Sequence, residues 1–265
     1  PDHTNRILSL KMINSKDSFV NKMRAASCTP KSTQRFLTAL EIYQATQNPF
    51  VNFDNIKPLE NLNHINNLAL IKKEDLNNLP KCAVIKLNGG LGTSMGCLAA
   101  KSSLPVKGAL SFLDIIAQSV LALPSPDKLP LYFMNSFSTD SLTKSLLDPY
   151  SSTLAIKHFL QSKVPRIQEE TCMPTNFDEE HKNWNPPGHA DVYYALDENG
   201  ILDDLLNDNI EFAFISNADN LGACFEPKLL NYMLEHNLDM LMECTAKTAS
   251  DLKGGILCQH NNTLD

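Results

Sequence analysis

Four glycines and a lysine in KCAVIKLNGGLGTSMGCLAAKSSLPVK, residues 81–107, have the types and spacing of a phosphate-binding loop. The glycines are Gly89, Gly90, Gly92 and Gly96. They follow an apolar run at residues 82–87 that predicts a buried strand. Glycine lets backbone N–H groups approach an anion closely, and Lys101 adds a positive charge after the loop. The pattern therefore predicts anion binding, and a plain turn between a strand and a helix is the alternative interpretation.

This loop fits neither of two familiar phosphate-binding signatures. A P-loop requires Gly-Lys five residues after its first glycine, and the corresponding positions hold Ser94, Met95 and Cys97. The dinucleotide fingerprint GxGxxG begins at Gly90 and Gly92, but its third glycine comes one residue late. What remains is a GxGT turn followed, after a short connection, by a lysine.

Polar clusters also follow three further apolar runs that predict strands. They read MNSFSTD, LQSKVPR and SNADNLG, and they begin at Met134, Leu160 and Ser216. In a parallel sheet, ligand sites lie at the carboxyl ends of the strands, so these clusters are candidates for one site. Thr139 and Asp140 in the first cluster are better explained as a helix cap. Asp219 in the last cluster is well placed to bind Mg²⁺ through its carboxylate.

A separate loop, NWNPPGHAD at residues 183–191, contains the only tryptophan of the chain. Its prolines stiffen the backbone, and Gly188 allows the backbone to lie against a planar ligand such as a base. His189 is either a surface-loop histidine, which is the commoner case, or a ligand-binding residue. The later run DLKGG, residues 251–255, predicts a turn before a short strand at residues 256–258.

The elements that would position these residues alternate between strand and helix. Apolar runs predict strands at residues 82–87, 129–135, 154–159, 210–216 and 239–244. Helical periodicity and flanking prolines predict helices at residues 110–123, 139–147 and 227–236. This alternation predicts an α/β fold with a mostly parallel sheet and helices on both of its faces.

The first 80 residues differ from the rest. Residues 1–47 predict helix, and an amphipathic stripe between residues 32 and 47 is formed by Phe36, Leu37, Leu40 and Tyr43. Residues 48–80 are rich in asparagine and proline, and they predict a connection with one short helix.

The composition is that of a globular protein, with 265 residues of which 43% are hydrophobic and 20% charged. No apolar run reaches the roughly 18 residues of a membrane span and no signal peptide is recognisable, so we expect a cytoplasmic protein without a membrane partner. The net charge of −7 argues against nucleic acid as a partner. Seven cysteines without a CxxC pair predict reduced thiols in the core, as at Cys82 and Cys244.

Taken in order, these motifs resemble the UTP–glucose-1-phosphate uridylyltransferases, also called UDP-glucose pyrophosphorylases. The matching runs are LNGGLGTSMG, KS, MNSF, QSxxPR, PPGH, SNxDNLG and KGG. The resemblance implies a Rossmann-like, glycosyltransferase-A-like nucleotidyltransferase domain at residues 81–265, after a helical N-terminal segment and connection at residues 1–80. It also implies reversible uridylyl transfer from UTP to glucose 1-phosphate, giving UDP-glucose and pyrophosphate with the assistance of Mg²⁺.

The resemblance implies a role for individual residues as well. Lys101 would be the catalytic lysine at the triphosphate, and Asp219 would bind Mg²⁺. The residues expected to contact the nucleotide are Leu87, Gly89, Gly90, Gly92, Gln161, Gly188 and His189. Among these, Gln161 would recognise uracil, because its amide both donates and accepts hydrogen bonds. The residues expected to contact the sugar are Asn220, Glu243 and Gly255.

The chain also departs from the family pattern. Ala99 and Ala100 replace Gly-Pro before the lysine, and Ala190 replaces the last glycine of a GHG motif. Related enzymes continue with a second phosphate-binding lysine and a C-terminal parallel β-helix used in oligomerisation, so this chain is either a fragment or a shortened relative, and its oligomeric state is open. There are two alternatives to an active uridylyltransferase for glucose 1-phosphate. One is a nucleotide-binding module without catalytic activity. The other is a related uridylyltransferase for another sugar, against which the LNGGLGTSMG motif argues.

Overall fold

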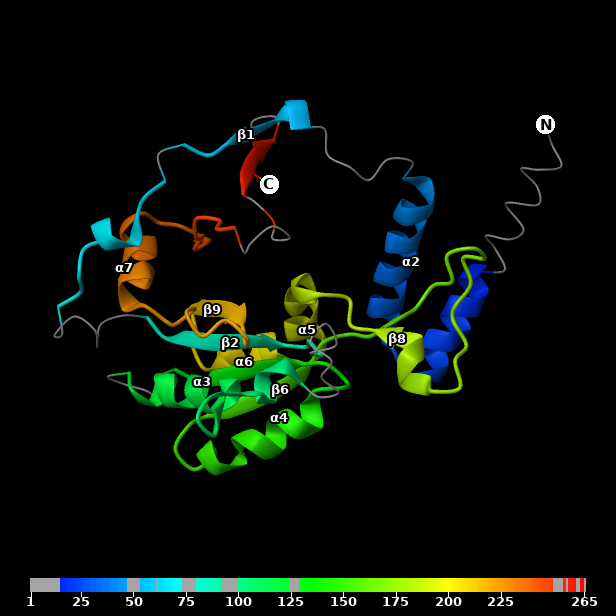
Figure 1. Cartoon of the computed structure of the whole chain (residues 1–265), viewed down its shortest axis with the longest axis horizontal. Helices are drawn as coiled ribbons and strands as arrows, with labels where there is room; N and C mark the ends of the chain where they lie inside the picture. The colour runs from blue at the N-terminus through cyan, green and yellow to red at the C-terminus, as the bar shows by residue number, and fades with distance from the viewer. Residues whose placement is uncertain are drawn as a thin grey trace. The chain divides into compact units, whose positions relative to one another are not determined.

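The computed structural model describes residues 15–46, 53–60, 62–72, 80–91, 100–123, 129–249, 255, 257–260 and 263–264 (Figure 1). Contacts divide the chain into two compact units, one combining Pro1–Tyr43 with Pro80–Phe225 and the other combining Gln44–Leu79 with Glu226–Asp265. The helical residues before position 44 therefore share a unit with most of the predicted strands. The domain boundary expected at residue 80 stays a prediction.

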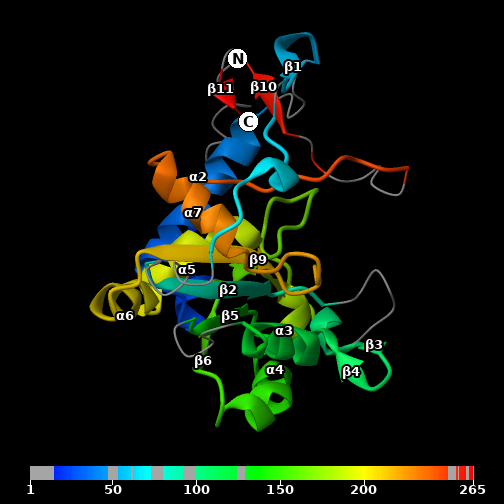
Figure 2. The same cartoon turned by 90° about the vertical axis from the view of Figure 1, so that its left-hand side faces the viewer.

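The first unit is built on a sheet whose strand pairs are parallel. Its strands, in the order β6-β5-β2-β9, are β6 (Ile156–Leu160), β5 (Leu131–Asn135), β2 (Cys82–Asn88) and β9 (Phe212–Asn217) (Figure 2). The register aligns their carboxyl ends, because Asn135 pairs with both Asn88 and Leu160, and Leu87 pairs with Asn217. The predicted mostly parallel α/β sheet is confirmed.

Alternate side chains of β2 pack against two different helix layers, because successive residues of a strand point to opposite faces. The helix bounds are α2 (Pro30–Ala45), α3 (Phe112–Leu121), α4 (Asp140–Leu147), α5 (Val192–Glu198) and α6 (Ile201–Asn207). Ala83, Ile85 and Leu87 pack with residues of α5 and α6. Val84 packs with residues of α3 and α4. Helices therefore cover both faces, as predicted, although α5 and α6 themselves were not predicted.

The N-terminal helices pack against the tryptophan loop. Residues 15–25 are helical, and Phe19 from this helix joins Phe36 and Leu40 of α2 in a buried cluster with Trp184. Tyr43, which was expected on the same stripe, is exposed. The two-residue strands β7 (Val164–Pro165) and β8 (Trp184–Asn185) pair beside this cluster, since Val164 also packs against it. The segment that follows Gln161 and the segment that precedes Gly188 therefore pair with each other and pack against the same apolar cluster.

Two short strands precede α3. These are β3 (Pro105–Lys107) and β4 (Leu110–Ser111), which pair antiparallel. The helix begins at Phe112 because Ser111 caps it, with a reciprocal hydrogen bond between Ser111 and Asp114.

The described part of the second unit includes a small antiparallel sheet and the α-helix α7. The elements are β1 (Ile56–Pro58), β10 (Cys258–His260), β11 (Thr263–Leu264) and α7 (Pro227–Glu235). Asn63 Nδ2 donates to the Tyr232 hydroxyl at 2.6 Å, which ties the chain before β2 to α7. None of the helices in the described ranges is long and apolar enough to cross a membrane.

The prediction of a strand at residues 239–244 is wrong. These residues form no strand in the structure, and Met240, Met242 and Cys244 are exposed. An extended apolar segment becomes a strand only where a neighbouring backbone accepts and donates its hydrogen bonds, and the described residues supply no such neighbour here. The expectation of a buried thiol is therefore wrong for Cys244, whereas Cys82 is buried as predicted.

Candidate active site

Gly89 and Gln161, both expected to contact a nucleotide, lie directly against each other. Gly89 follows β2 and Gln161 follows β6, two strands that flank β5. A Cβ atom on Gly89 would lie 2.0 Å from Gln161 Nε2, so this contact requires glycine. The Gln161 side chain is 7% exposed, and its backbone N–H donates to Asn135 O at 2.9 Å. The backbone of Gln161 is thus fixed at the carboxyl edge of the sheet, and its side-chain amide lies against Gly89.

Lys101 and Asp219, the expected catalytic lysine and metal ligand, form an ion pair. Lys101 Nζ lies 2.6 Å from Asp219 Oδ2, and the two side chains are 38% and 34% exposed. The Lys101 backbone N–H donates to Gly90 O at 3.3 Å, so the backbone of Lys101 lies next to the start of the glycine-rich loop. The Lys101 ammonium is therefore accessible to an anionic ligand, and the Asp219 carboxylate is accessible to a cation. Gly92 lies outside the described residues.

The substitution of alanine for proline at position 100 leaves the backbone in a conformation that proline would also adopt. Ala100 has φ −54° and is buried, and proline restricts φ to about −65°. The approach to Lys101 therefore keeps its geometry without the ring. Ala99 lies outside the described residues.

A buried polar network supports the end of β2 next to Lys101. Asn88 Nδ2 donates to Asn135 Oδ1 and to Thr143 Oγ1, each at 2.8 Å. Ser102 Oγ donates to Asn88 Oδ1 at 2.5 Å. Because Ser102 follows Lys101 directly, this network fixes the point from which the lysine side chain extends. The network was not predicted from the sequence, although its members occur in and after the motifs LNGG, KS and MNSF.

Thr139 does not cap α4, contrary to the prediction. It is the residue before the helix, but its Oγ1 donates to Asn88 O at 2.7 Å and accepts from the Ser136 N–H at 2.9 Å. Asp140 accepts from Asn135 Nδ2 at 2.9 Å. The polar cluster after β5 therefore joins the end of β5 to the end of β2. The buried carbonyl of Asn88 needs a hydrogen-bond donor, and the Thr139 hydroxyl supplies it.

Lys86 holds the loop that carries Asp219. Its Nζ donates to Ser216 Oγ at 2.7 Å and to Ala223 O at 2.8 Å, and it lies 5.3 Å from the centre of the Phe214 ring. Burial lowers the pKa of Lys86 to about 8. The loop is thereby attached near both of its ends to the central strand. This role was not predicted, and the signal that could have revealed it is a lysine inside the apolar run CAVIKLN.

The Gly188–His189 segment is linked to the Gln161 segment through Asp191. Gly188 has φ +117°, a conformation that favours glycine, and the exposed His189 begins a 3-10 turn, His189–Asp191. Asp191 is 7% exposed, and its Oδ2 accepts from the Ser162 N–H at 2.6 Å. Two loops that were predicted separately to contact the base are therefore connected by one charge-assisted hydrogen bond.

The remaining expected residues have simpler surroundings. Leu87 is buried in the sheet, and its carbonyl accepts from the Ala218 N–H at 3.0 Å. Asn220 Oδ1 accepts from the Gly222 N–H at 3.1 Å, which stabilises its own turn. Glu243 and Gly255 are exposed and belong to the second unit.

Asp219 suits a magnesium ion better than a metal held entirely by protein. Among the described residues, no group of three or more His, Cys, Asp and Glu side chains converges as metal ligands. Mg²⁺ commonly binds one or two carboxylates and completes its shell with water and substrate phosphates. A single accessible carboxylate such as that of Asp219 fits that mode.

Comparison with known proteins identifies relatives of this chain. The family model described as UTP–glucose-1-phosphate uridylyltransferase matches residues 33–265. The UTP–glucose-1-phosphate uridylyltransferase of Encephalitozoon cuniculi is 34% identical over 257 residues, which cover 96% of this chain and 52% of the relative. That of Saccharomyces cerevisiae is 42% identical over 193 residues, which cover 71% of this chain and 39% of the relative. The chain therefore spans about half of the first relative and less of the second.

Solved structures give the same result. A Trypanosoma brucei protein described as UDP-glucose phosphorylase has a TM-score of 0.86 at 33% identity, covering 95% of this chain and 55% of that one. A variant of the Leishmania major UDP-glucose pyrophosphorylase in complex with UDP-glucose has a TM-score of 0.81 at 33% identity, covering 93% and 52%. The resemblance inferred from the motifs is confirmed: the chain belongs to the UTP–glucose-1-phosphate uridylyltransferase family.

Proposed function

We propose that the protein transfers a uridylyl group reversibly from UTP to glucose 1-phosphate, giving UDP-glucose and pyrophosphate. The observation that carries this proposal is the pairing of Lys101, whose N–H donates to Gly90 O, with Asp219, in a chain of this family. The curated relatives bear the name of this reaction, and one structural neighbour binds UDP-glucose.

The reaction requires charge compensation more than proton transfer. The phosphate of glucose 1-phosphate is already an anion when it attacks the α-phosphorus of UTP, so no general base is needed. The protein has to hold two anions in line and offset their repulsion. Lys101 would donate to oxygens of the α-phosphate, and backbone N–H groups of the glycine-rich loop would receive the other phosphates. Mg²⁺ at Asp219 would supply further positive charge there.

Uracil recognition falls to the Gln161 amide. It lies against the backbone of Gly89, and an amide matches the donor and acceptor pattern of the uracil edge. Gly188 would face the base and His189 the phosphates, since the Asp191–Ser162 hydrogen bond joins their segment to that of Gln161.

The proposal for the sugar side is carried by the family resemblance. Asn220, Glu243 and Gly255 would contact the glucose hydroxyls, which need short polar partners and open backbone. A cytoplasmic location and the absence of nucleic-acid partners stay predictions, as does the oligomeric state.

Calorimetry followed by a turnover assay tests the function. We expect UTP with Mg²⁺ to bind more tightly than CTP, and glucose 1-phosphate then to release pyrophosphate. Binding of UTP without any release of pyrophosphate would support a silent nucleotide-binding module instead. If UTP does not bind at all, both functions are rejected for this chain.

A further inference from the structure

We infer that Arg35 and Asp191 are positioning residues for base recognition, through which the N-terminal helix α2 holds the Gln161 segment against the Gly188–His189 segment. The inference rests on the proposed function, because it concerns how that nucleotide site selects uracil.

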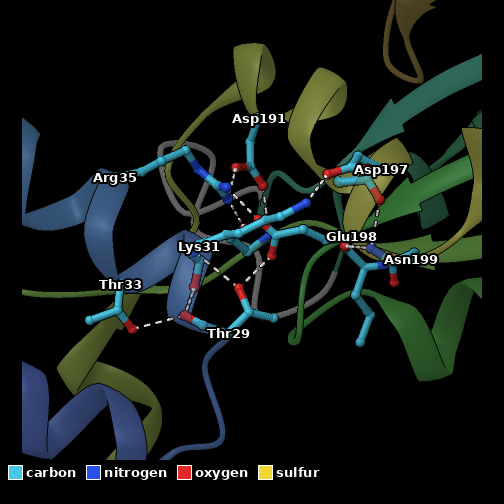
Figure 3. A network of polar contacts seen from close by, with 12 residues as sticks. Thr29, Lys31, Thr33, Arg35, Asp191, Asp197, Glu198 and Asn199 are labelled. Carbon is cyan, nitrogen blue, oxygen red and sulfur yellow. Dashed lines mark hydrogen bonds and ion pairs between the residues drawn. The ribbon is translucent and has the colours of Figure 1, made fainter.

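Ser162, the residue directly after Gln161, is held by two charged side chains. Its N–H donates to Asp191 Oδ2 at 2.6 Å, and its Oγ accepts from Arg35 Nη2 at 3.3 Å. The same Nη2 lies 3.9 Å from Asp191 Oδ1, and Figure 3 shows the Arg35 guanidinium directed toward that carboxylate. Arg35, Ser162 and Asp191 thus contact one another pairwise and form a closed triangle. Arg35 lies on α2, Ser162 follows Gln161, and Asp191 follows the Gly188–His189 segment.

The Arg35 guanidinium is itself fixed by the helix that follows the Gly188–His189 segment. It forms an ion pair with Glu198, and its Cζ lies 4.2 Å from the centre of the Tyr194 ring. Both partners belong to α5. A planar guanidinium can donate in several directions and stack at the same time, which the single ammonium of lysine cannot do. Arg35 therefore joins α2, α5 and Ser162 at one point.

Apolar packing keeps α2 in place independently of these charges. Phe36, the neighbour of Arg35, packs in the buried cluster with Trp184, and Val164 packs against the same cluster. Trp184 precedes Gly188 by four residues and Val164 follows Gln161 by three. Removal of the Arg35 charge should consequently leave the helix docked, while it loosens the triangle.

The consequence concerns discrimination between bases. Gln161 Nε2 donates and Oε1 accepts, a pattern that matches the edge of uracil. This match excludes other bases as long as the distance between Gln161 and the Gly188–His189 segment is fixed. The backbone N–H of Gln161 is already held by Asn135, so the Asp191–Ser162 hydrogen bond controls the other side of the same residue. Loss of this control should allow the amide to accept other bases.

The test compares the dissociation constants for CTP and UTP and takes their ratio as the measure of base preference. Both constants are measured by calorimetry and, independently, from the change in Trp184 fluorescence on binding. We expect Arg35→Ala and Arg35→Lys each to lower this ratio roughly tenfold, since one hydrogen bond to a charged group is lost. Asp191→Asn keeps an acceptor for the Ser162 N–H and should retain most of the ratio, whereas Asp191→Ala should not. Lys31→Ala is the matched control, because Lys31 also bridges α2 and α5 through its exposed ion pair with Asp197 at 2.7 Å.

The outcomes separate this inference from the proposed function. A wild-type chain without preference for UTP contradicts the proposed function itself. A wild-type preference that Arg35→Ala leaves intact, in a variant with an unchanged circular dichroism spectrum, overturns the inference alone. If Arg35→Ala and Lys31→Ala lower the CTP/UTP ratio equally, the inference is also overturned, because a general effect on the docking of α2 would then explain both decreases. If Arg35→Ala does not fold, equal ratios in Asp191→Asn and Asp191→Ala overturn the inference, and a loss only in Asp191→Ala supports it.

Discussion

Lys101 Nζ donates to Asp219 Oδ2 at 2.6 Å, although 118 residues separate the two in the chain. They meet because Asp219 follows β9 and the glycine-rich loop follows β2, and these strands are paired. Both side chains are about one-third exposed, so the ion pair contributes at most about 1 kcal/mol to the free energy of unfolding. The ion pair therefore adds little to stability, and both side chains remain accessible for the ligand-binding roles proposed above.

Lys101→Ala should reduce the turnover number by roughly two to three orders of magnitude, because its charge matters most as the α-phosphate reacts. The dissociation constant for UTP should change much less. Steady-state kinetics and calorimetry on the same variant compare the two quantities. Equal losses in turnover and in affinity would show that Lys101 only binds.

Gln161→Ala should relax the preference for uridine nucleotides, because the amide that matches the uracil edge is removed. Competition between UTP and CTP measures this preference. A variant that still discriminates as well as the wild type would refute the assigned role.

Gly89→Ala should weaken UTP binding because the new methyl carbon would lie 2.0 Å from Gln161 Nε2 and would displace that side chain. The matched control is the same substitution in a Gln161→Ala background, where the obstructing amide is absent. There the additional loss should be small, so the double-mutant cycle should show coupling between the two positions. Additive effects would mean that Gly89 acts through its backbone alone.

Ala100→Pro should fold normally and keep the wild-type turnover number, since φ at this position is already −54°. The thermal midpoint and the rate of pyrophosphate release are the measurements. A large gain in turnover would show instead that the alanine has impaired the approach of Lys101.

Lys86 should make the free energy of unfolding rise with pH between about 8 and 10.5. Burial lowers its pKa from 10.5 to about 8, so in this window the unfolded chain binds a proton that the folded chain has released. The full effect is about 3 kcal/mol. Urea titrations at several pH values, with Lys86→Met as the comparison, measure it as a difference between the two proteins.

That difference is needed because Cys82 acts in the opposite direction. Burial raises the pKa of Cys82 from 9.0 to about 12, so its stabilising contribution is present below pH 9 and is lost as the pH rises. Cys82 is common to both proteins and cancels in the comparison. Parallel pH profiles for wild type and Lys86→Met would refute this role of Lys86.

Features that depend on local pattern could be predicted from the sequence. The strands β2, β5, β6 and β9 were recognised as short apolar runs, the pattern typical of parallel sheets. Of these, β2 and β5 are buried along their whole length, whereas β6 and β9 are only partly buried. Gln161 comes directly after β6, and Asp219 comes two residues after the end of β9. Because strand ends share one edge in a parallel sheet, their common location followed from the same pattern.

Features that depend on distant partners could not be predicted. Residues 239–244 have the composition of a strand, but no neighbouring backbone supplies hydrogen bonds to them among the described residues. Thr139 has the type and position of a cap, but the buried carbonyl of Asn88 competes for its hydroxyl. Arg35 looks like a polar residue on an amphipathic helix, and only the fold shows that it reaches Ser162.

The central claim is attack on the α-phosphorus of UTP, and isotope position tests it most directly. UTP labelled at its α-phosphate is incubated with the protein, glucose 1-phosphate and Mg²⁺. We expect the label to appear in UDP-glucose and the released pyrophosphate to be unlabelled. Label in the pyrophosphate, or bound UTP that never transfers its label, would contradict this claim.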